Sequence, residues 1–254
     1  MFAILLMILI GVAGYAVQAR LKSVFEKYSK VLSPGGMTGA ELAEKMLHDH
    51  GIYNVKVTHV KGHLTDHFNP VTMTVNLSDS VYSSRSVAAA AVACHECGHA
   101  VQHAVGYGPI KMRSRMVPVV SIASQMSTWV VMIGLFMMIA TNDPTIAWIG
   151  VSMVAISAIF SLVTLPVEYN ASDRALAWLQ SSGTLQGNEV EGARESLRWA
   201  ARTYVVAALS AIATLLYYVF IILSARPDKI DEQGGFQYAY LAPSGCRCCC
   251  RHND

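Results

Sequence analysis

Four segments of the chain contain no charged residue, and each is about long enough to cross a lipid bilayer as a helix. A transmembrane helix needs roughly 20 apolar residues to span the hydrocarbon core. Only 14% of the 254 residues are charged, against about 25% in an average globular chain. We therefore expect an α-helical membrane protein with about four transmembrane helices, at residues 1–19, 116–142, 144–167 and 203–225.

These assignments have two alternatives. The first segment could be a cleaved signal peptide, because Val17-Gln18-Ala19 resembles a cleavage site. However, it lacks the positively charged start that signal peptides usually have. The other three segments could be buried helices of a soluble core, but their length favours membrane spans.

The distribution of Lys and Arg predicts the orientation of the helices, because the cytoplasmic flanks of transmembrane helices are enriched in both. Positive residues follow the first segment, precede the second and separate the third from the fourth, whereas the link at 141–145 has none. The pattern predicts that residues 20–115 and 168–202 are cytoplasmic. The N-terminus and the tail at 226–254 would lie outside, and we expect the tail to be disordered.

Several function classes are disfavoured. The net charge is only +2, and there is no P-loop, Gly-rich dinucleotide fingerprint or basic stripe with interleaved aromatic residues. We therefore expect no nucleic acid among the partners, which leaves the lipid bilayer and a peptide or protein substrate. A transporter is disfavoured because its spans usually carry ionisable residues, and these spans have none.

Residues 20–115 predict a small α+β domain. Thr38 and Glu41 have the spacing of a capping box, so a helix should begin there, and Gly51 is placed to end it. Residues 55–57 and 71–77 alternate between apolar and polar side chains. This alternation predicts two half-buried strands that pair as a hairpin.

An Ala-rich stretch at 84–105 predicts a further helix, and it carries His95-Glu96-Cys97-Gly98-His99. This run matches the H-E-x-x-H pattern. Positions i and i+4 share one face of a helix, so both imidazoles can bind one zinc ion. Glu96 would act as general base on the zinc-bound water. The alternative is a pair of histidines with a structural role.

A catalytic zinc needs a third protein ligand and one open position. His103 lies eight residues after His95, about 12 Å along a helix, so we place it at the rim or behind a ligand. Glu168 is the better candidate for the single zinc ion. Two predicted spans separate it from His99, so the chain leaves and returns to the same side of the membrane. A carboxylate there could instead be an interfacial charge.

Other polar residues could support this site. Asn170, Ser172 and Asp173 follow Glu168 on the same helix and could hydrogen-bond a liganding histidine. In the loop between the two strands, His63 or His67 could support catalysis by contacting the substrate or the negative charge that develops on it. The alternative is a polar loop held together by its own hydrogen bonds.

Five stretches carry a resemblance to a known family: Tyr28-Ser29-Lys30, Met37-Thr38-Gly39-Ala40-Glu41, Gly62-His63-Leu64-Thr65-Asp66-His67, His95-Glu96-Cys97-Gly98-His99-Ala100 and Pro166-Val167-Glu168-Tyr169-Asn170-Ala171-Ser172. Together they resemble the YugP-like family of membrane neutral zinc metallopeptidases. The similarity covers roughly residues 1–225. The resemblance implies a multi-pass protein of the bacterial inner membrane with a gluzincin-like site, in which two histidines and a downstream glutamate bind zinc. A more distant similarity, to HtpX and CAAX-prenyl-type membrane proteases, implies the pattern E-x-x-A-D, where this chain has Ser172 instead of Asp.

We therefore predict a membrane zinc metalloendopeptidase whose active site faces the cytoplasm. The alternative is an inactive, zinc-stabilised assembly or chaperone factor, for which Glu96 would be dispensable.

Cys94 and Cys97 could form a C-x-x-C metal clip, but we expect them to be small core residues. The cysteines of the tail could be acylated, bind metal, form disulfides or have no function; they are Cys246, Cys248, Cys249 and Cys250.

Overall fold

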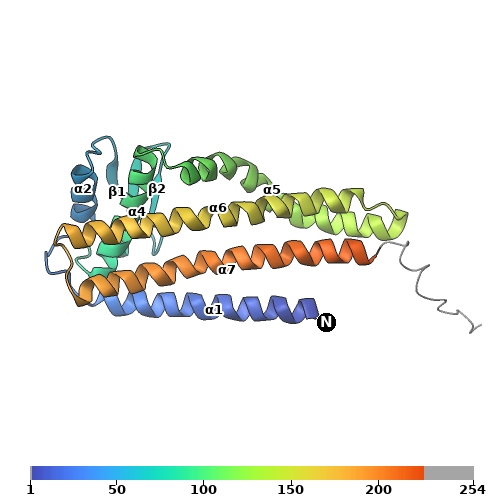
Figure 1. The fold of residues 1–254 in the computed structure, drawn as a ribbon, viewed down its shortest axis with the longest axis horizontal. Helices are drawn as coiled ribbons and strands as arrows, with labels where there is room; N and C mark the ends of the chain where they lie inside the picture. The colour runs from blue at the N-terminus through green and yellow to red at the C-terminus, as the bar shows by residue number, and fades with distance from the viewer. Residues whose placement is uncertain (1, 226–254) are drawn as a thin grey trace, which may run out of the picture.

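The computed structural model describes residues 2–225, in which four long helices run side by side and a small α/β unit lies at one end (Figure 1). The predicted disorder of residues 226–254, and the cysteines there, lie outside the described residues. The helices are α1 (Phe2–Ser29), α2 (Gly39–Asp49), α3 (Asp79–Tyr82), α4 (Val87–Ala104), α5 (Gly108–Thr141), α6 (Thr145–Ser181) and α7 (Asn188–Ser224). The strands are β1 (Lys56–Val60), β2 (His67–Asn69) and β3 (Thr74–Ser78).

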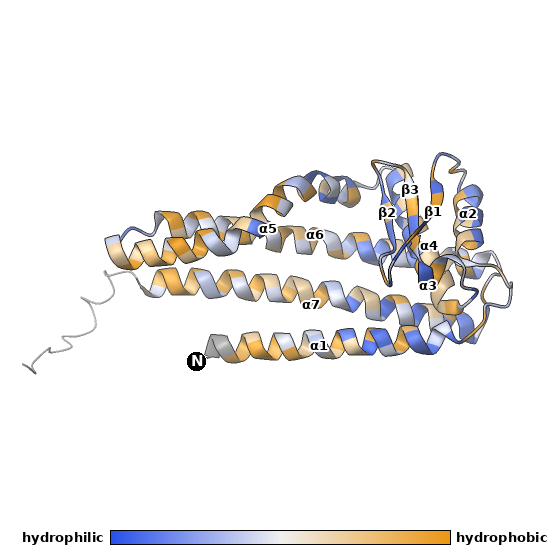
Figure 2. Ribbon diagram, turned by 180° about the vertical axis from the view of Figure 1, so that it is seen from behind, coloured by the Kyte–Doolittle hydropathy of each residue, from blue (hydrophilic) through white to orange (hydrophobic). Residues whose placement is uncertain are grey.

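Helices α1, α5, α6 and α7 are each long and apolar enough to cross a membrane. Figure 2 shows apolar residues along their far ends and polar residues where they approach the α/β unit. Trp129, Phe136 and Ile139 on α5 are 72%, 71% and 80% exposed. Large apolar side chains with this exposure suit contact with lipid rather than the core of a soluble protein. The protein is thus an α-helical membrane protein with a small α+β domain, as the sequence predicted.

Each predicted span is one part of a longer helix. Helix α1 continues ten residues past residue 19, α6 continues to Ser181, and α7 begins at Asn188, well before residue 203. Outside the apolar segments, α1 and α7 are joined by polar contacts. Glu195 accepts a hydrogen bond of 2.7 Å from the Tyr28 hydroxyl and pairs with Arg20 and Lys27.

The predicted hairpin is wrong. Strand β1 pairs with β3 in parallel, and β2, which the sequence did not predict, pairs with β3 antiparallel at the other edge, giving the order β1-β3-β2. Alternation marks a strand but does not identify its neighbour, and the long connection contains a short strand of its own. Two carboxylates hold that connection. Asp66 accepts from the backbone N–H and hydroxyl of Ser78, and Asp79 accepts from the backbone N–H of Gly62.

The two helices predicted for the α/β unit are confirmed. Thr38 and Glu41 form a capping box at the start of α2, and Gly51, just after the helix, has a φ of +70° that favours glycine. Helix α4 begins after Ser86, whose hydroxyl oxygen accepts from the N–H of Ala89 at 3.2 Å. Most of α4 is buried between the α/β unit on one side and α6 and α7 on the other.

Small residues allow α4 to lie very close to α6. A Cβ atom built on Gly98 would be 2.6 Å from the carbonyl oxygen of Ala171. Only glycine permits that approach. This contact brings the H-E-x-x-H run of α4 against the segment of α6 that carries Glu168.

Candidate metal centre

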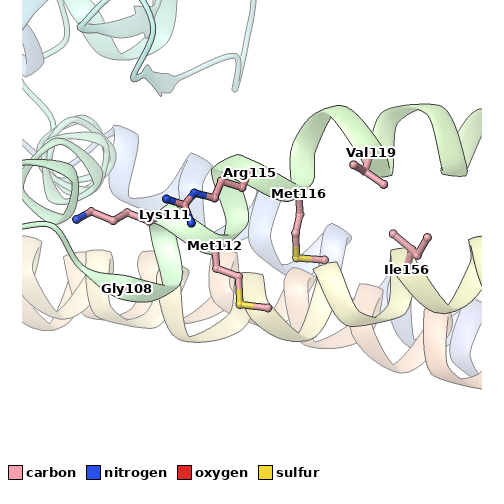
Figure 3. A pocket seen from close by; sticks show the side chains of 7 residues that line it. All are labelled: Gly108, Lys111, Met112, Arg115, Met116, Val119 and Ile156. Carbon is pink, nitrogen blue, oxygen red and sulfur yellow. The ribbon is translucent and has the colours of Figure 1, made fainter.

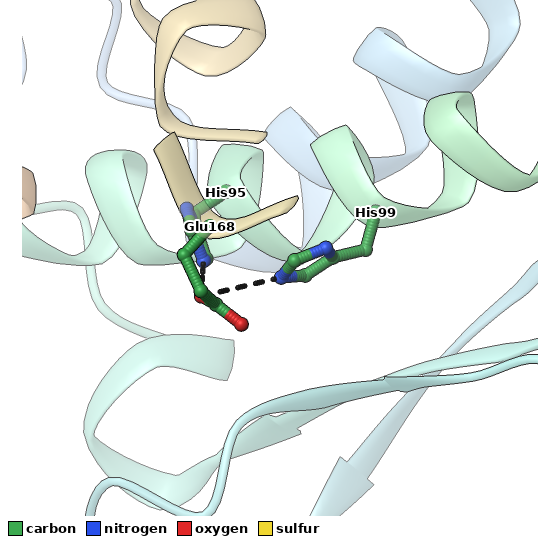
Figure 4. Close-up of side chains that lie close together, drawn as sticks. All are labelled: His95, His99 and Glu168. Carbon is green, nitrogen blue, oxygen red and sulfur yellow. Dashed lines mark hydrogen bonds and ion pairs between the residues drawn. The ribbon is translucent and has the colours of Figure 1, made fainter. Parts of the chain in front are cut away.

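His95, His99 and Glu168 meet between α4 and α6 (Figure 4). The Nε2 atoms of His95 and His99 lie 3.2 and 3.7 Å from Oε2 of Glu168. A tetrahedral ion with bonds of about 2.0–2.1 Å separates its ligand atoms by about 3.3 Å. All three ligand atoms lie within 4.8 Å of one another, so a short inward movement of the side chains would bring them onto one small cation.

The donor set also favours zinc. Glu168 is 2% exposed, and a buried carboxylate needs a cationic partner. Two imidazole nitrogens with one carboxylate oxygen are typical ligands of catalytic zinc, which leaves a fourth position open. Helix α4 supplies the two histidines one turn apart, and α6 supplies Glu168 across the close contact at Gly98.

Side chains behind the histidines fix the orientation of their rings. Nδ1 of His95 lies 3.2 Å from the hydroxyl oxygen of Ser172, and Nδ1 of His99 lies 3.0 Å from Oε1 of Gln102. The amide nitrogen of Gln102 donates to the carbonyl of Val167 at 2.7 Å and to Oδ1 of Asn170 at 3.0 Å. Partners of this kind hold Nε2 toward the metal.

The structure therefore places two of the three predicted supporting residues near the site. Ser172 contacts His95 directly, and Asn170 contacts His99 only through Gln102. Asp173 is exposed and makes no hydrogen bond or ion pair with residues 2–225. In α6 it follows Ser172 by one position, which turns its side chain about 100° away from the face that carries Glu168 and Ser172.

The charges around His99 favour a cation at the site. Burial by itself lowers the pKa of this imidazole, but the Glu168 carboxylate and the charge of Glu96 raise its pKa above the usual value.

Burial raises the pKa of the Cys94 thiol and of the Cys97 thiol far above the ordinary value. Both cysteines are fully buried and the Cys97 thiol donates to the carbonyl of Ala43. The two thiols pack the core and do not join the three metal-ligand candidates.

Glu96 borders a cavity of about 400 Å³ that also includes His99 and Glu168. Its Oε2 accepts a 3.0 Å hydrogen bond from the backbone N–H of Phe68 in β2. Among the described residues no other hydrogen bond to the Glu96 carboxylate is found. One carboxylate oxygen is thus held by the edge strand, and the other has no protein partner there.

The remaining histidines differ in their position relative to this cavity. His67 lines it, and its ring contacts the Thr65 carbonyl and the side chain of Asn76. His63 is exposed, packs edge-on against Phe25 and is not part of the lining. His103 is exposed and packs against Phe68. It is not part of the cavity lining and is not one of the three candidate ligands.

Three residues of the site were not predicted from the sequence. Gln102 holds His99, and Arg113 of α5 and Tyr204 of α7 line the cavity. Gln102 follows His99 by three positions on one helix, and that spacing could have identified it. No sequence signal identifies Arg113 or Tyr204, because their position depends on how three helices pack.

Comparison with known proteins agrees with the geometry. A family model described as "Putative neutral zinc metallopeptidase" matches residues 3–223. Over 229 residues the chain is 40% identical to "Putative membrane protease YugP" of Bacillus subtilis (strain 168), which covers 90% of this chain and 100% of that protein. No solved structure shows significant similarity to the chain. The resemblance predicted from the sequence is confirmed, and the chain belongs to this family of neutral zinc metallopeptidases.

Proposed function

We propose that the protein is a zinc-dependent endopeptidase of the gluzincin type, with one zinc ion per chain, that hydrolyses peptide bonds of membrane proteins or their fragments. The observation that carries this proposal is the meeting of His95, His99 and Glu168 beside a cavity that Glu96 also borders. The name of the Bacillus subtilis relative, a membrane protease, agrees with it.

Zinc bound by these three ligands would polarise a substrate carbonyl and lower the pKa of a water molecule to about 7. Glu96 then accepts the proton of that water as its oxygen adds to the carbonyl carbon. The same carboxylate delivers the proton to the leaving nitrogen as the C–N bond breaks. The Phe68 N–H orients Glu96 for both transfers through Oε2.

Strand β2 offers a way to align the substrate. It lies at the edge of the sheet, and pairing with β3 occupies only one of its sides. An extended peptide can add to such an edge through backbone hydrogen bonds. Because Phe68 of β2 contacts Glu96, a peptide bound there would lie beside the metal ligands.

The position of Glu168 along α6 supports a site near the membrane surface. It lies 23 residues after Thr145, the first residue of α6, which corresponds to about 35 Å along a helix. The hydrocarbon core is about 30 Å thick. The charge pattern of the sequence supports the cytoplasmic face of a bacterial inner membrane, where residues 20–115 and 168–202 would lie.

The test compares purified wild type with Glu96→Gln in the same detergent, with zinc content recorded. Glu44→Gln is the control, because Glu44 is an exposed glutamate of α2 away from the cavity. We expect Glu96→Gln to keep zinc and to lose on the order of 100-fold or more in the rate of casein or self cleavage. Glu44→Gln should match the wild type.

The competing function is an inactive, zinc-stabilised membrane assembly or chaperone factor. In that case the wild type would bind zinc and cleave nothing, or Glu96→Gln would cleave as fast as the wild type. Either result would contradict the proposed peptidase. A structural zinc site has no open position and needs no general base, so the location of Glu96 at the cavity favours the enzyme.

A further inference from the structure

Arg113 faces the metal site from α5. One terminal nitrogen, Nη2, lies 3.8 Å from Oε1 of Glu168, the carboxylate oxygen that does not contact the histidines. That separation is longer than a hydrogen bond. The Nε atom of Arg113 is buried and has no hydrogen-bond partner among residues 2–225. A guanidinium with an unpaired donor therefore borders the cavity.

Tyr204 of α7 lines the same cavity as Arg113, Glu96 and Glu168. Helix α4 thus contributes the proposed base, whereas α5 and α7 contribute a cation and a hydroxyl donor. The same lining includes three carboxylates, of Asp66, Glu96 and Glu168, and two histidines, His67 and His99.

The ion pair with Glu168 leaves the Nε donor of Arg113 without a partner among the described residues. A buried donor without a partner costs roughly 1–3 kcal/mol, so a group that accepts a hydrogen bond from Nε would recover that free energy. Once a cation binds Glu168, it neutralises part of the carboxylate charge, and the attraction between Glu168 and the Arg113 guanidinium becomes weaker. A negatively charged oxygen arriving in the cavity would provide a new partner.

We propose that Arg113, assisted by the Tyr204 hydroxyl, binds the oxyanion that forms on the substrate during peptide hydrolysis. When the oxygen of water bonds to the carbonyl carbon, the π pair of the C=O bond moves onto the carbonyl oxygen and the water proton moves to Glu96. The N–H groups of Arg113 donate to that oxygen. As the C–N bond breaks, the pair returns to form C=O and the proton passes to the leaving nitrogen. This inference rests on the proposed peptidase function.

The neighbouring Arg115 provides a matched control on the same helix. Two residues further along α5 it is turned by about 200°, and it lines a separate groove with Lys111 and Met112 (Figure 3). It has the same side chain as Arg113, and the lining of the metal cavity does not include it. Substitution of Arg115 therefore shows the effect of removing a positive charge from α5, and the additional effect of substituting Arg113 can be assigned to its position at the metal cavity.

The experiment measures inhibitor binding to the zinc-loaded protein in detergent by calorimetry. One probe is N-phosphoryl-Leu-Trp, whose tetrahedral phosphorus carries oxyanions like those of the addition intermediate. The other is mercaptoacetyl-Leu-Trp, which binds zinc through sulfur and presents no such oxyanion. The variants are Arg113→Met, Arg113→Lys, Tyr204→Phe and Arg115→Met.

We expect Arg113→Met to weaken phosphoryl-peptide binding on the order of 100-fold, the effect of losing one oxyanion donor. Binding of the thiol peptide and zinc content should stay within about twofold. Arg113→Lys should recover part of the loss, because it keeps the charge without the planar fork. Tyr204→Phe should show a smaller loss in the same direction, and Arg115→Met none.

Three results would overturn the inference, and they differ from one another. Equal weakening of both probes by Arg113→Met would mean that Arg113 binds the Leu-Trp part that they share or supports the fold, and loss of zinc would mean that it supports the metal ligands. Unchanged phosphoryl-peptide binding would mean that the guanidinium does not meet the oxyanion. If the zinc-loaded wild type binds neither probe, the proposed peptidase function fails first and this inference fails with it.

Discussion

Gly98→Ala tests whether the close contact between α4 and α6 builds the metal centre. The added Cβ would lie 2.6 Å from the Ala171 carbonyl oxygen, where ordinary contact begins at 3.4 Å. Both sides of this contact are helix backbone, so the helices must separate by about 0.8 Å locally. Metal–ligand distances in a working site hold to within about 0.2 Å. Gly98 adjoins His99 and Ala171 lies one turn after Glu168, so that separation falls directly on the ligands.

Overpacking of this kind costs about 1–3 kcal/mol, and each 1.4 kcal/mol is a factor of ten. We therefore expect Gly98→Ala to weaken zinc binding about 5- to 150-fold, measured by competition with a chromophoric chelator. Circular dichroism should still show the helices. Gly11→Ala is the control, since nothing lies within 4 Å of a Cβ built there. Wild-type zinc affinity in Gly98→Ala would refute the view that this contact sets the ligand spacing.

Three further predictions concern residues around the site. Gln102→Leu should lower zinc affinity about 10- to 100-fold, the usual effect of losing a partner behind a liganding histidine; a chelator titration showing wild-type affinity would contradict that role. His67→Ala should slow casein cleavage about fivefold because it removes hydrogen bonds that hold the cavity edge. His63→Ala should leave the rate unchanged, and equal effects of the two variants would refute this distinction. Because burial raises the pKa of the Cys94 and Cys97 thiols, both stay protonated at neutral pH, and peptide mapping should find neither alkylated by maleimide until the protein is denatured. Alkylation of the native protein at either position would show that these thiols are accessible.

Features of one continuous helix could be predicted from the sequence. The capping box of α2 and the i, i+4 pair of His95 and His99 depend only on the helical repeat, and both have the predicted geometry. The candidacy of Glu168 depended on counting membrane crossings between it and His99. That argument works because two spans in succession return the chain to its starting side, whatever their packing.

Features that depend on how elements pack against one another could not be predicted. Alternation in the sequence indicated strands, but it carried no information about which strand pairs with which, so the parallel pairing of β1 with β3 was missed. The apolar segments indicated spans, but a helix ends where its capping and hydrogen bonding end, not where its hydropathy changes. Helices α6 and α7 therefore continue past the apolar segments.

The same distinction separates the metal ligands from the groups proposed to act on the substrate. A metal needs three donors at short distances. Two of them, His95 and His99, lie one helical turn apart, so a short sequence motif identifies two of the three ligands. An oxyanion site needs only a donor aimed at a point in the cavity. Arg113 lines the metal cavity from the first part of α5, before Pro118 of the same helix. Its neighbour Arg115 has the same sequence context and faces the other way. The orientation of α5 about its own axis decides which of the two arginines faces the metal cavity, and no pattern in the sequence predicts that orientation.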